Sequence, residues 1–177
     1  EEQATRSDVV AEWTETSGTR NLSETIKDAV TSIVLDESMQ DARPTSTAYW
    51  FNDFTNVTQI TGLNYLNTSA TTNMRSMFYY CSSLTTLDVS GFDTRNVTSM
   101  GYMFAGCVSL TTLDVTGFDT QNVTDMQHMF HYSKALTTIY GDDWSQSSVL
   151  TESEDMFTGC EALVGGNGTA YDENHTD

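Results

Sequence analysis

Hydrophobic residues recur along the chain at a fixed spacing. The pair Met77-Phe78 is followed after 26, 26 and 27 residues by the equivalent pairs Met103-Phe104, Met129-Phe130 and Met156-Phe157. Leucine and valine positions keep the same register, and a weaker copy begins at Trp50-Phe51. Self-similarity at a period of roughly 20–50 residues is typical of stacked repeat architectures. The sequence therefore predicts about four stacked coils.

Each repeat has two halves with different patterns. Residues 84–89 end in an alternation that fits a short strand. The apolar residues of 97–104 fall on one face of about two helical turns, with Asn96 or Thr98 as the cap and Gly106 at the end. The predicted fold class is an α/β solenoid. It is a leucine-rich-repeat-like right-handed coil with a parallel β-sheet face, short helices opposite and an N-terminal cap.

Three segments follow from the position of the repeats. Residues 1–48 lack the period and are predicted to be an N-terminal cap, with a short helix over 25–29 and a strand over 31–35. Residues 49–160 are the solenoid. Residues 161–177 contain a glycine-rich run and are predicted to form a loop or a truncated C-terminal cap.

Charge and composition narrow the function classes. Seven basic residues against 25 acidic ones give a net charge of −18, which excludes ordinary nucleic-acid binding and argues against docking on anionic membranes. The sequence contains no run of about 18 apolar residues and therefore predicts no insertion into a membrane. We see neither a signal peptide nor an anchor, so the chain is either cytosolic or a piece of a larger protein. The threonine-rich, lysine-poor composition favours the second alternative, a monomeric fragment of an extracellular or cell-surface protein.

The outward positions of the predicted strands are the candidate binding site. Stacking should align them into ladders on an open sheet face, which is the usual binding surface of a solenoid. The candidates are Thr86, Asp88, Ser90, Thr112, Asp114, Thr116, Thr138 and Tyr140. Hydroxyls, carboxylates and one aromatic ring suit a hydroxyl-rich partner such as a glycan. The alternative is a solvated face that serves only solubility and strand formation.

Other residue types are interpreted as structural. The Met/Phe stripe is predicted to be core and the three cysteines to be buried thiols, because stacked side chains that point the same way give poor disulfide geometry. Asp93 and Asp119, with Asp142-Asp143, could bind calcium, but aspartate in a turn more often bonds its own backbone. His128 and His131 could share a zinc ion, yet no further ligand is near in sequence. We predict no cofactor, no metal and no enzymatic activity, because no catalytic set is visible.

Several longer segments carry a resemblance. The matching pieces are 42–51, 60–68, the pattern Met-x-x-Met-Phe-x-x-Cys-x-x-Leu from Met74, the pattern Leu-Asp-Val-Ser-Gly-Phe-Asp-Thr from Leu87, and 163–172. In these the sequence resembles the BspA-like leucine-rich-repeat family of bacterial surface proteins. The resemblance implies a cell-surface adhesin of Gram-positive bacteria, attached to the cell wall in the full-length protein. Its implied partners are host mucin, glycans, epithelial cells or matrix proteins.

Three functions stay open at this stage. The first is an adhesin domain, whose negative charge predicts stronger mucin binding at about pH 4–5 than at pH 7. The second is a structural spacer that projects another domain from the cell wall. The third is ice binding by the Thr-Thr ladders.

Overall fold

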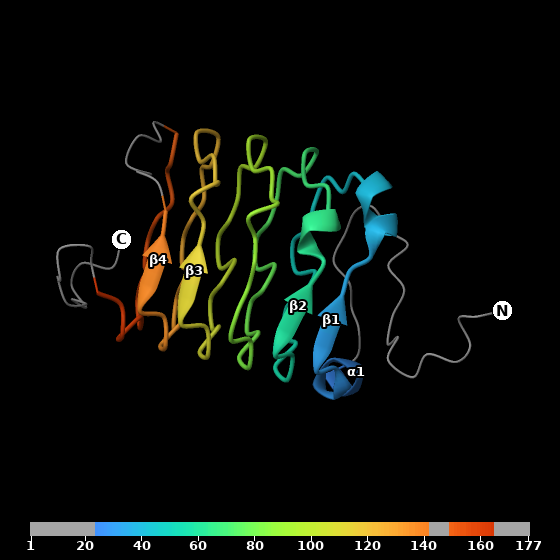
Figure 1. Cartoon of the computed structure of the whole chain (residues 1–177). Coiled ribbons are helices and arrows are strands. Elements are labelled where there is room, and N and C mark those ends of the chain that lie inside the picture. The colour runs from blue at the N-terminus through green and yellow to red at the C-terminus, as the bar shows by residue number, and fades with distance from the viewer. Residues whose placement is uncertain (1–23, 142–148, 165–177) are drawn as a thin grey trace.

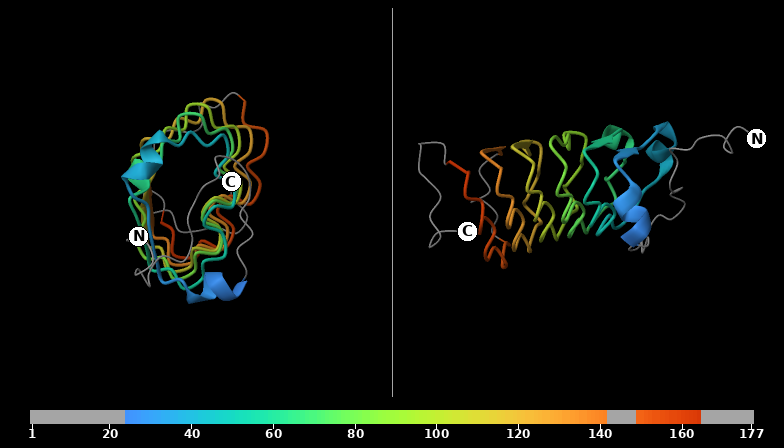
Figure 2. Two further views of the ribbon diagram at one scale, coloured as in Figure 1. Left: turned by 90° about the vertical axis from the view of Figure 1, so that its right-hand side faces the viewer. Right: turned by 90° about the horizontal axis from the view of Figure 1, so that it is seen from below.

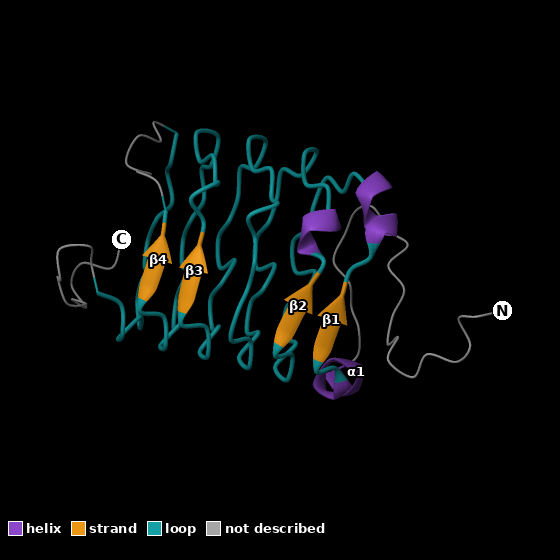
Figure 3. Cartoon of the chain, in the orientation of Figure 1, coloured by secondary structure: helices purple, strands orange, loops and turns teal. Residues whose placement is uncertain are grey.

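Successive coils of the chain stack side by side along one axis (Figure 1). The computed structural model describes residues 24–141 and 149–164. Viewed along the axis, the coils superpose on a common outline (Figure 2). Most of each coil is extended chain and turns (Figure 3). The regular elements are α1 (Glu24–Ala29), β1 (Ser32–Val34), the 3-10 helix η2 (Glu37–Asp41), β2 (Gln59–Thr61), the 3-10 helix η3 (Leu63–Tyr65), β3 (Thr112–Asp114) and β4 (Thr138–Tyr140).

A column of phenylalanine rings runs through the centre of the stack. Phe78 and Phe104 lie with ring centroids 5.7 Å apart and planes 4° apart, and Phe104 and Phe130 are also 5.7 Å apart. Phe51 and Phe157 extend the column at its two ends, each 5.4 Å from the next ring. The methionines of the repeats are buried beside it. The prediction that the Met/Phe stripe is core is confirmed.

The side of the stack that carries the Met-Phe pairs is joined by an unbroken ladder of backbone hydrogen bonds. We call it the bridged side; its five segments are 46–53, 73–80, 99–106, 125–132 and 152–159. Parallel bridges link Ser46, Asn73, Ser99, Asp125 and Glu152 in sequence. Four alternate N–H groups of each of the first four segments donate to the next coil, for example Met100 N to Asp125 O at 2.8 Å and Phe104 N to Met129 O at 2.9 Å.

This ladder replaces the short helices that the sequence predicted, and the prediction of a helix over 97–104 is wrong. The N–H groups of Met100 and Phe104 bond to the next coil and are therefore not available to a helix. Tyr102 also has a φ of 59°, a left-handed conformation that an α-helix excludes. Met103 N donates three positions back to Met100 O, and Ala105 N does the same to Tyr102 O, so the segment is a series of tight turns.

The opposite side carries the strands and is interrupted. We call it the sheet side; its segments are 31–35, 58–61, 85–88, 111–115 and 137–140. β1 pairs with β2 and β3 pairs with β4, both in parallel. Within the described residues, no backbone hydrogen bond joins 85–88 to the segment on either side of it. Thus the strand predicted over 84–89 is extended chain without pairing, whereas its equivalents β3 and β4 are paired.

The first coil of the stack begins before the repeat becomes visible in the sequence. α1 lies where a helix was predicted over 25–29, and β1 lies within the predicted strand 31–35. Ile33 is in register with Ile60, so the spacing of 27 residues reaches back into the segment predicted to be a cap. The remaining parts of the two predicted end segments, 1–23 and 165–177, lie outside the described residues.

The three cysteines are free and buried, as the sequence predicted. The Cys107 thiol donates to the carbonyl of Phe78 in the preceding coil at 3.3 Å, and the Ser133 hydroxyl makes the same bond to Phe104 at 2.8 Å. Burial raises the pKa of Cys107 to about 12. These thiols therefore belong to the stacking contacts and are not reactive groups.

Candidate functional site

The predicted ladder on the sheet side is present where the strands pair. Thr112 lies in register with Thr138, and Asp114 lies in register with Tyr140. Tyr140 is 55% exposed, and Thr138 is half-buried. The structure thus brings the four candidates of β3 and β4 together on one face.

The two aspartates of the ladder are bound to their own turns. Asp88 Oδ1 accepts from Ser90 N at 3.0 Å and from Ser90 Oγ at 2.6 Å. Asp114 Oδ1 accepts from Thr116 N and Oγ1 at 3.0 and 2.8 Å. These hydrogen bonds to the charged form hold the pKa of both carboxyls below the ordinary aspartate value. Ser90 and Thr116 therefore shape the turns, and each aspartate stays ionised at neutral pH.

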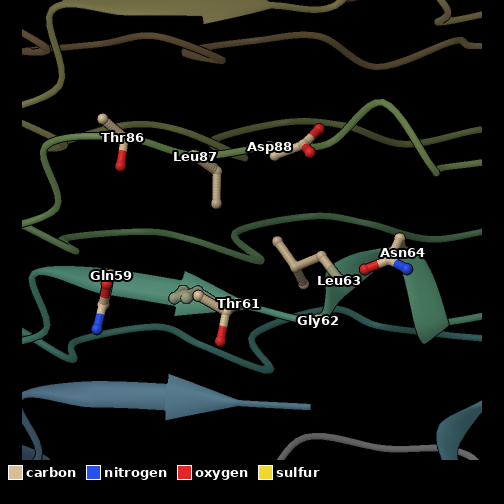
Figure 4. Close-up of a pocket in the computed structure, with 9 residues that line it drawn as sticks. Gln59, Thr61, Gly62, Leu63, Asn64, Thr86, Leu87 and Asp88 are labelled. Carbon is tan, nitrogen blue, oxygen red and sulfur yellow. The ribbon is translucent and has the colours of Figure 1, made fainter. Parts of the chain in front are cut away.

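A groove opens on the sheet side at the interruption, between β2 and residues 86–88 (Figure 4). We call it the sheet groove. It is lined by Gln59, Ile60, Thr61, Gly62, Leu63, Asn64, Thr86, Leu87 and Asp88, and its volume is about 360 Å³. Two of the predicted site residues, Thr86 and Asp88, therefore lie in a concave surface, whereas those of β3 and β4 lie on paired strands.

A difference in length between neighbouring coils accompanies the groove. The stretch from the start of the strand position to the inward apolar position is eight residues long in one coil, Gln59 to Leu66, and seven residues long in the next, Thr86 to Phe92. The longer coil accommodates its extra residue in η3, which follows Gly62 at a φ of 77°. A Cβ on Gly62 would lie 1.9 Å from Leu35 O, so this turn packs onto the preceding coil. The two backbones consequently follow different paths after their strands.

Asp93 and Asp119, the calcium candidates, bond within their own turns. Asp93 accepts from Arg95 Nη2 at 2.7 Å, and Asp119 Oδ1 accepts from Gln121 N at 3.0 Å. Their proposed companion Asp142-Asp143 lies outside the described residues. Among the residues that the structure describes, no group of three or more His, Cys, Asp or Glu side chains could hold a metal ion.

The two histidines belong to a ribbon of aromatic rings on the bridged side, which sequence reasoning missed. Neighbouring rings have centroids 4.5–6.1 Å apart in the order Tyr80, Tyr79, Tyr102, His128, His131, Tyr132. The signal was available, since two aromatic residues precede the cysteine position in the second and fourth repeats. Tyr80 lies over Gly106 and Tyr132 over Gly159, where a Cβ would come within 2.9 and 3.1 Å of the rings, and both rings remain about half exposed.

An ion pair crosses two steps of the stack on the same side. Arg75 Nη1 donates to Asp125 Oδ2 at 2.8 Å, and the guanidinium lies 4.7 Å from the Tyr102 ring. The pair passes over Gly101, where a Cβ would lie 2.6 Å from Arg75 Nη1. We call this contact the Arg75 clasp, and it ties the second coil to the fourth.

The stacked coils and their recurring contacts define a repeat protein. Residues 45–167 match a family model described as "Mycoplasma protein of unknown function, DUF285", and the chain belongs to this family. Searches of curated proteins and of solved structures found no match. Within the described residues, none of the helices has the length and apolarity needed to cross a bilayer.

Proposed function

We propose that this chain is a leucine-rich-repeat-like solenoid that acts as a non-enzymatic adhesion module. In this proposal it is part of a bacterial cell-surface protein and binds host mucus glycans, epithelial cells or matrix proteins through its sheet side. The resemblance to BspA-like surface proteins supports the extracellular, wall-attached location. The alternative is a spacer that projects another domain.

The arrangement of the sheet side is the observation that supports binding most. It presents exposed hydroxyls, two ionised carboxylates and the ring of Tyr140 along neighbouring coils. A concave stretch at the sheet groove adjoins this ladder. Convergent polar groups next to apolar surface are typical of ligand sites.

Hydrogen bonds within the stack argue against ice binding by two of the threonine ladders, those that contain Thr137 and Thr124. The Thr137 hydroxyl donates to Thr111 O at 3.0 Å, and the Thr124 hydroxyl donates to Thr98 O at 3.1 Å. These hydroxyl protons are therefore engaged within the stack.

The test is binding of the immobilised chain to mucin and to a glycan array. Because the net charge is −18, repulsion from sialate and sulfate should weaken as carboxylates are protonated, so mucin binding should be several-fold stronger at pH 4.5 than at pH 7 in low salt. Added salt at pH 7 should also strengthen mucin binding, because it screens the same repulsion. Equal binding at the two pH values would contradict the electrostatic part of the proposal.

Variants test whether the sheet side is the binding face. Asp88→Ala, Asp114→Ala and Tyr140→Ala, tried in parallel, should each weaken glycan binding, with about a tenfold loss for the tyrosine. Glu152→Gln/Glu154→Gln is the matched control, because it removes two charges from exposed residues of the bridged side. A chain that binds no mucin, matrix protein or cell would favour the spacer.

A further inference from the structure

We propose that the sheet groove binds one neutral pyranose unit of a glycan, held by hydrogen bonds from two coils and by apolar contact with Leu87. This assignment rests on the proposed adhesion function and specifies the ligand for one part of its surface.

The size of the groove suits a small ligand. A volume of about 360 Å³ lies at the lower end of the range for ligand pockets, about 300–1,000 Å³. A single sugar ring fits such a volume, whereas a folded protein partner would not enter it. The backbone adds polar groups, because 85–88 forms no backbone hydrogen bond with the neighbouring coils among the described residues.

The side chains of the groove have unused hydrogen-bonding capacity. The described part of the chain offers no hydrogen-bond partner to the side chains of Gln59, Thr61, Asn64 or Thr86. By contrast, the Thr98 hydroxyl, which lies outside the groove, donates to Thr72 O of the preceding coil at 3.1 Å. Side-chain amides both donate and accept, which matches the paired hydroxyls of a sugar.

One apolar side chain completes the site. Leu63 and Leu87 lie on opposite sides of the gap in Figure 4, but Leu63 is buried, so Leu87 provides the apolar surface of the groove. Leu87 is half-buried, whereas its equivalent Leu113 is 1% exposed. The C–H face of a pyranose can cover the exposed part of Leu87 and remove it from water.

The charge of the groove selects against acidic sugars. Asp88 is its one ionisable side chain, and no basic side chain lines it. The carboxylate can accept a hydrogen bond from a sugar hydroxyl, but it repels sialate and sulfate. Because the pKa of Asp88 is held below the ordinary aspartate value by Ser90, this selectivity should persist at pH 5.

The experiment uses the full chain on an array of neutral, sialylated and sulfated glycans, with titration of free galactose, N-acetylgalactosamine and N-acetylglucosamine followed by NMR. We expect at least one neutral sugar to bind, with similar affinity at pH 7 and pH 5. Gln59→Ala/Asn64→Ala should weaken it more than tenfold, since the double variant removes hydrogen bonds from two side chains of the groove. Asp88→Asn should weaken neutral sugars less and admit sialylated ones, while retaining the Ser90 turn.

Asp119→Asn is the matched control, because it makes the same change at an aspartate that also accepts from its own turn but lies outside both the groove and the predicted ladder. It should leave neutral-sugar binding unchanged. Binding that is insensitive to Gln59→Ala/Asn64→Ala, or that requires sialate or a basic peptide, would overturn the groove assignment. Mucin binding without any neutral-sugar binding would overturn the groove assignment alone. Absence of all binding would overturn the adhesion function as well.

Discussion

The two sides of the stack are built from the same repeats but differ in continuity. On the bridged side, four backbone hydrogen bonds join each coil to the next, without interruption from residue 46 to residue 159. On the sheet side, β1–β2 and β3–β4 are paired, and 85–88 between them is not. One continuous ladder is therefore sufficient to hold the coils together. The other side is free to vary, and its variation creates the groove.

The largest effect is expected from the ring column, because both sides depend on it. Phe104→Ala removes a buried ring stacked between Phe78 and Phe130 and should lower the free energy of unfolding by about 3–5 kcal/mol. Phe157→Ala should cost less, because Phe157 is half-buried at the end of the column. Urea denaturation measures both. Similar costs would show that the column is not the common core.

A second pair of variants compares paired and unpaired strands. Leu113→Ala, within β3, should cost about 2–5 kcal/mol because its side chain is fully buried. Leu87→Ala, beside the sheet groove, should cost about 1–2 kcal/mol because part of its surface is already in water. Equal losses in urea denaturation would mean that the groove is closed in solution.

The Arg75 clasp gives a smaller effect on the bridged side. Gly101→Ala places a Cβ against Arg75 Nη1 and should cost about 1–2 kcal/mol by displacing a partly buried ion pair. Gly117→Ala is the control, since no atom lies within 4 Å of a Cβ there. It should be neutral within about 0.5 kcal/mol or slightly stabilising. Gly101→Ala behaving like Gly117→Ala would show that the clasp does not support the stack.

The smallest effect concerns pH. Burial and the neighbouring His128 hold the pKa of His131 below its ordinary value, and Asp155 acts in the opposite direction. The folded state therefore takes up this proton less readily than the unfolded chain. The contribution of neutral His131 to the free energy of unfolding is therefore present at pH 7. It is lost as the pH falls through the pKa that His131 has in the folded state. His131→Gln should show a smaller fall in urea midpoint from pH 7 to pH 5 than the native chain, and an identical fall would contradict this.

The repeat in the sequence predicted which side chains are buried. It did not predict the course of the backbone, on which the turns of the bridged side and the sheet groove depend. The buried positions of Met77, Phe78 and Cys81 followed from spacing alone, because stacking places equal residues on equal sites. The helix over 97–104 failed because the 26-residue spacing is equally compatible with turns whose N–H groups bond the next coil. The groove could not be predicted either, since it arises from one extra residue near Gly62 and the resulting divergence of two coils.

Amide hydrogen exchange measured by NMR tests the contrast between the two sides most directly. The N–H groups of Met100, Tyr102 and Phe104, bonded to the next coil, should exchange slowly, near the limit set by global unfolding. Those of 86–88 should exchange at least about a hundredfold faster, because local opening is not needed to expose them. Equal protection in the two segments would show a continuous sheet and would contradict the account of the groove.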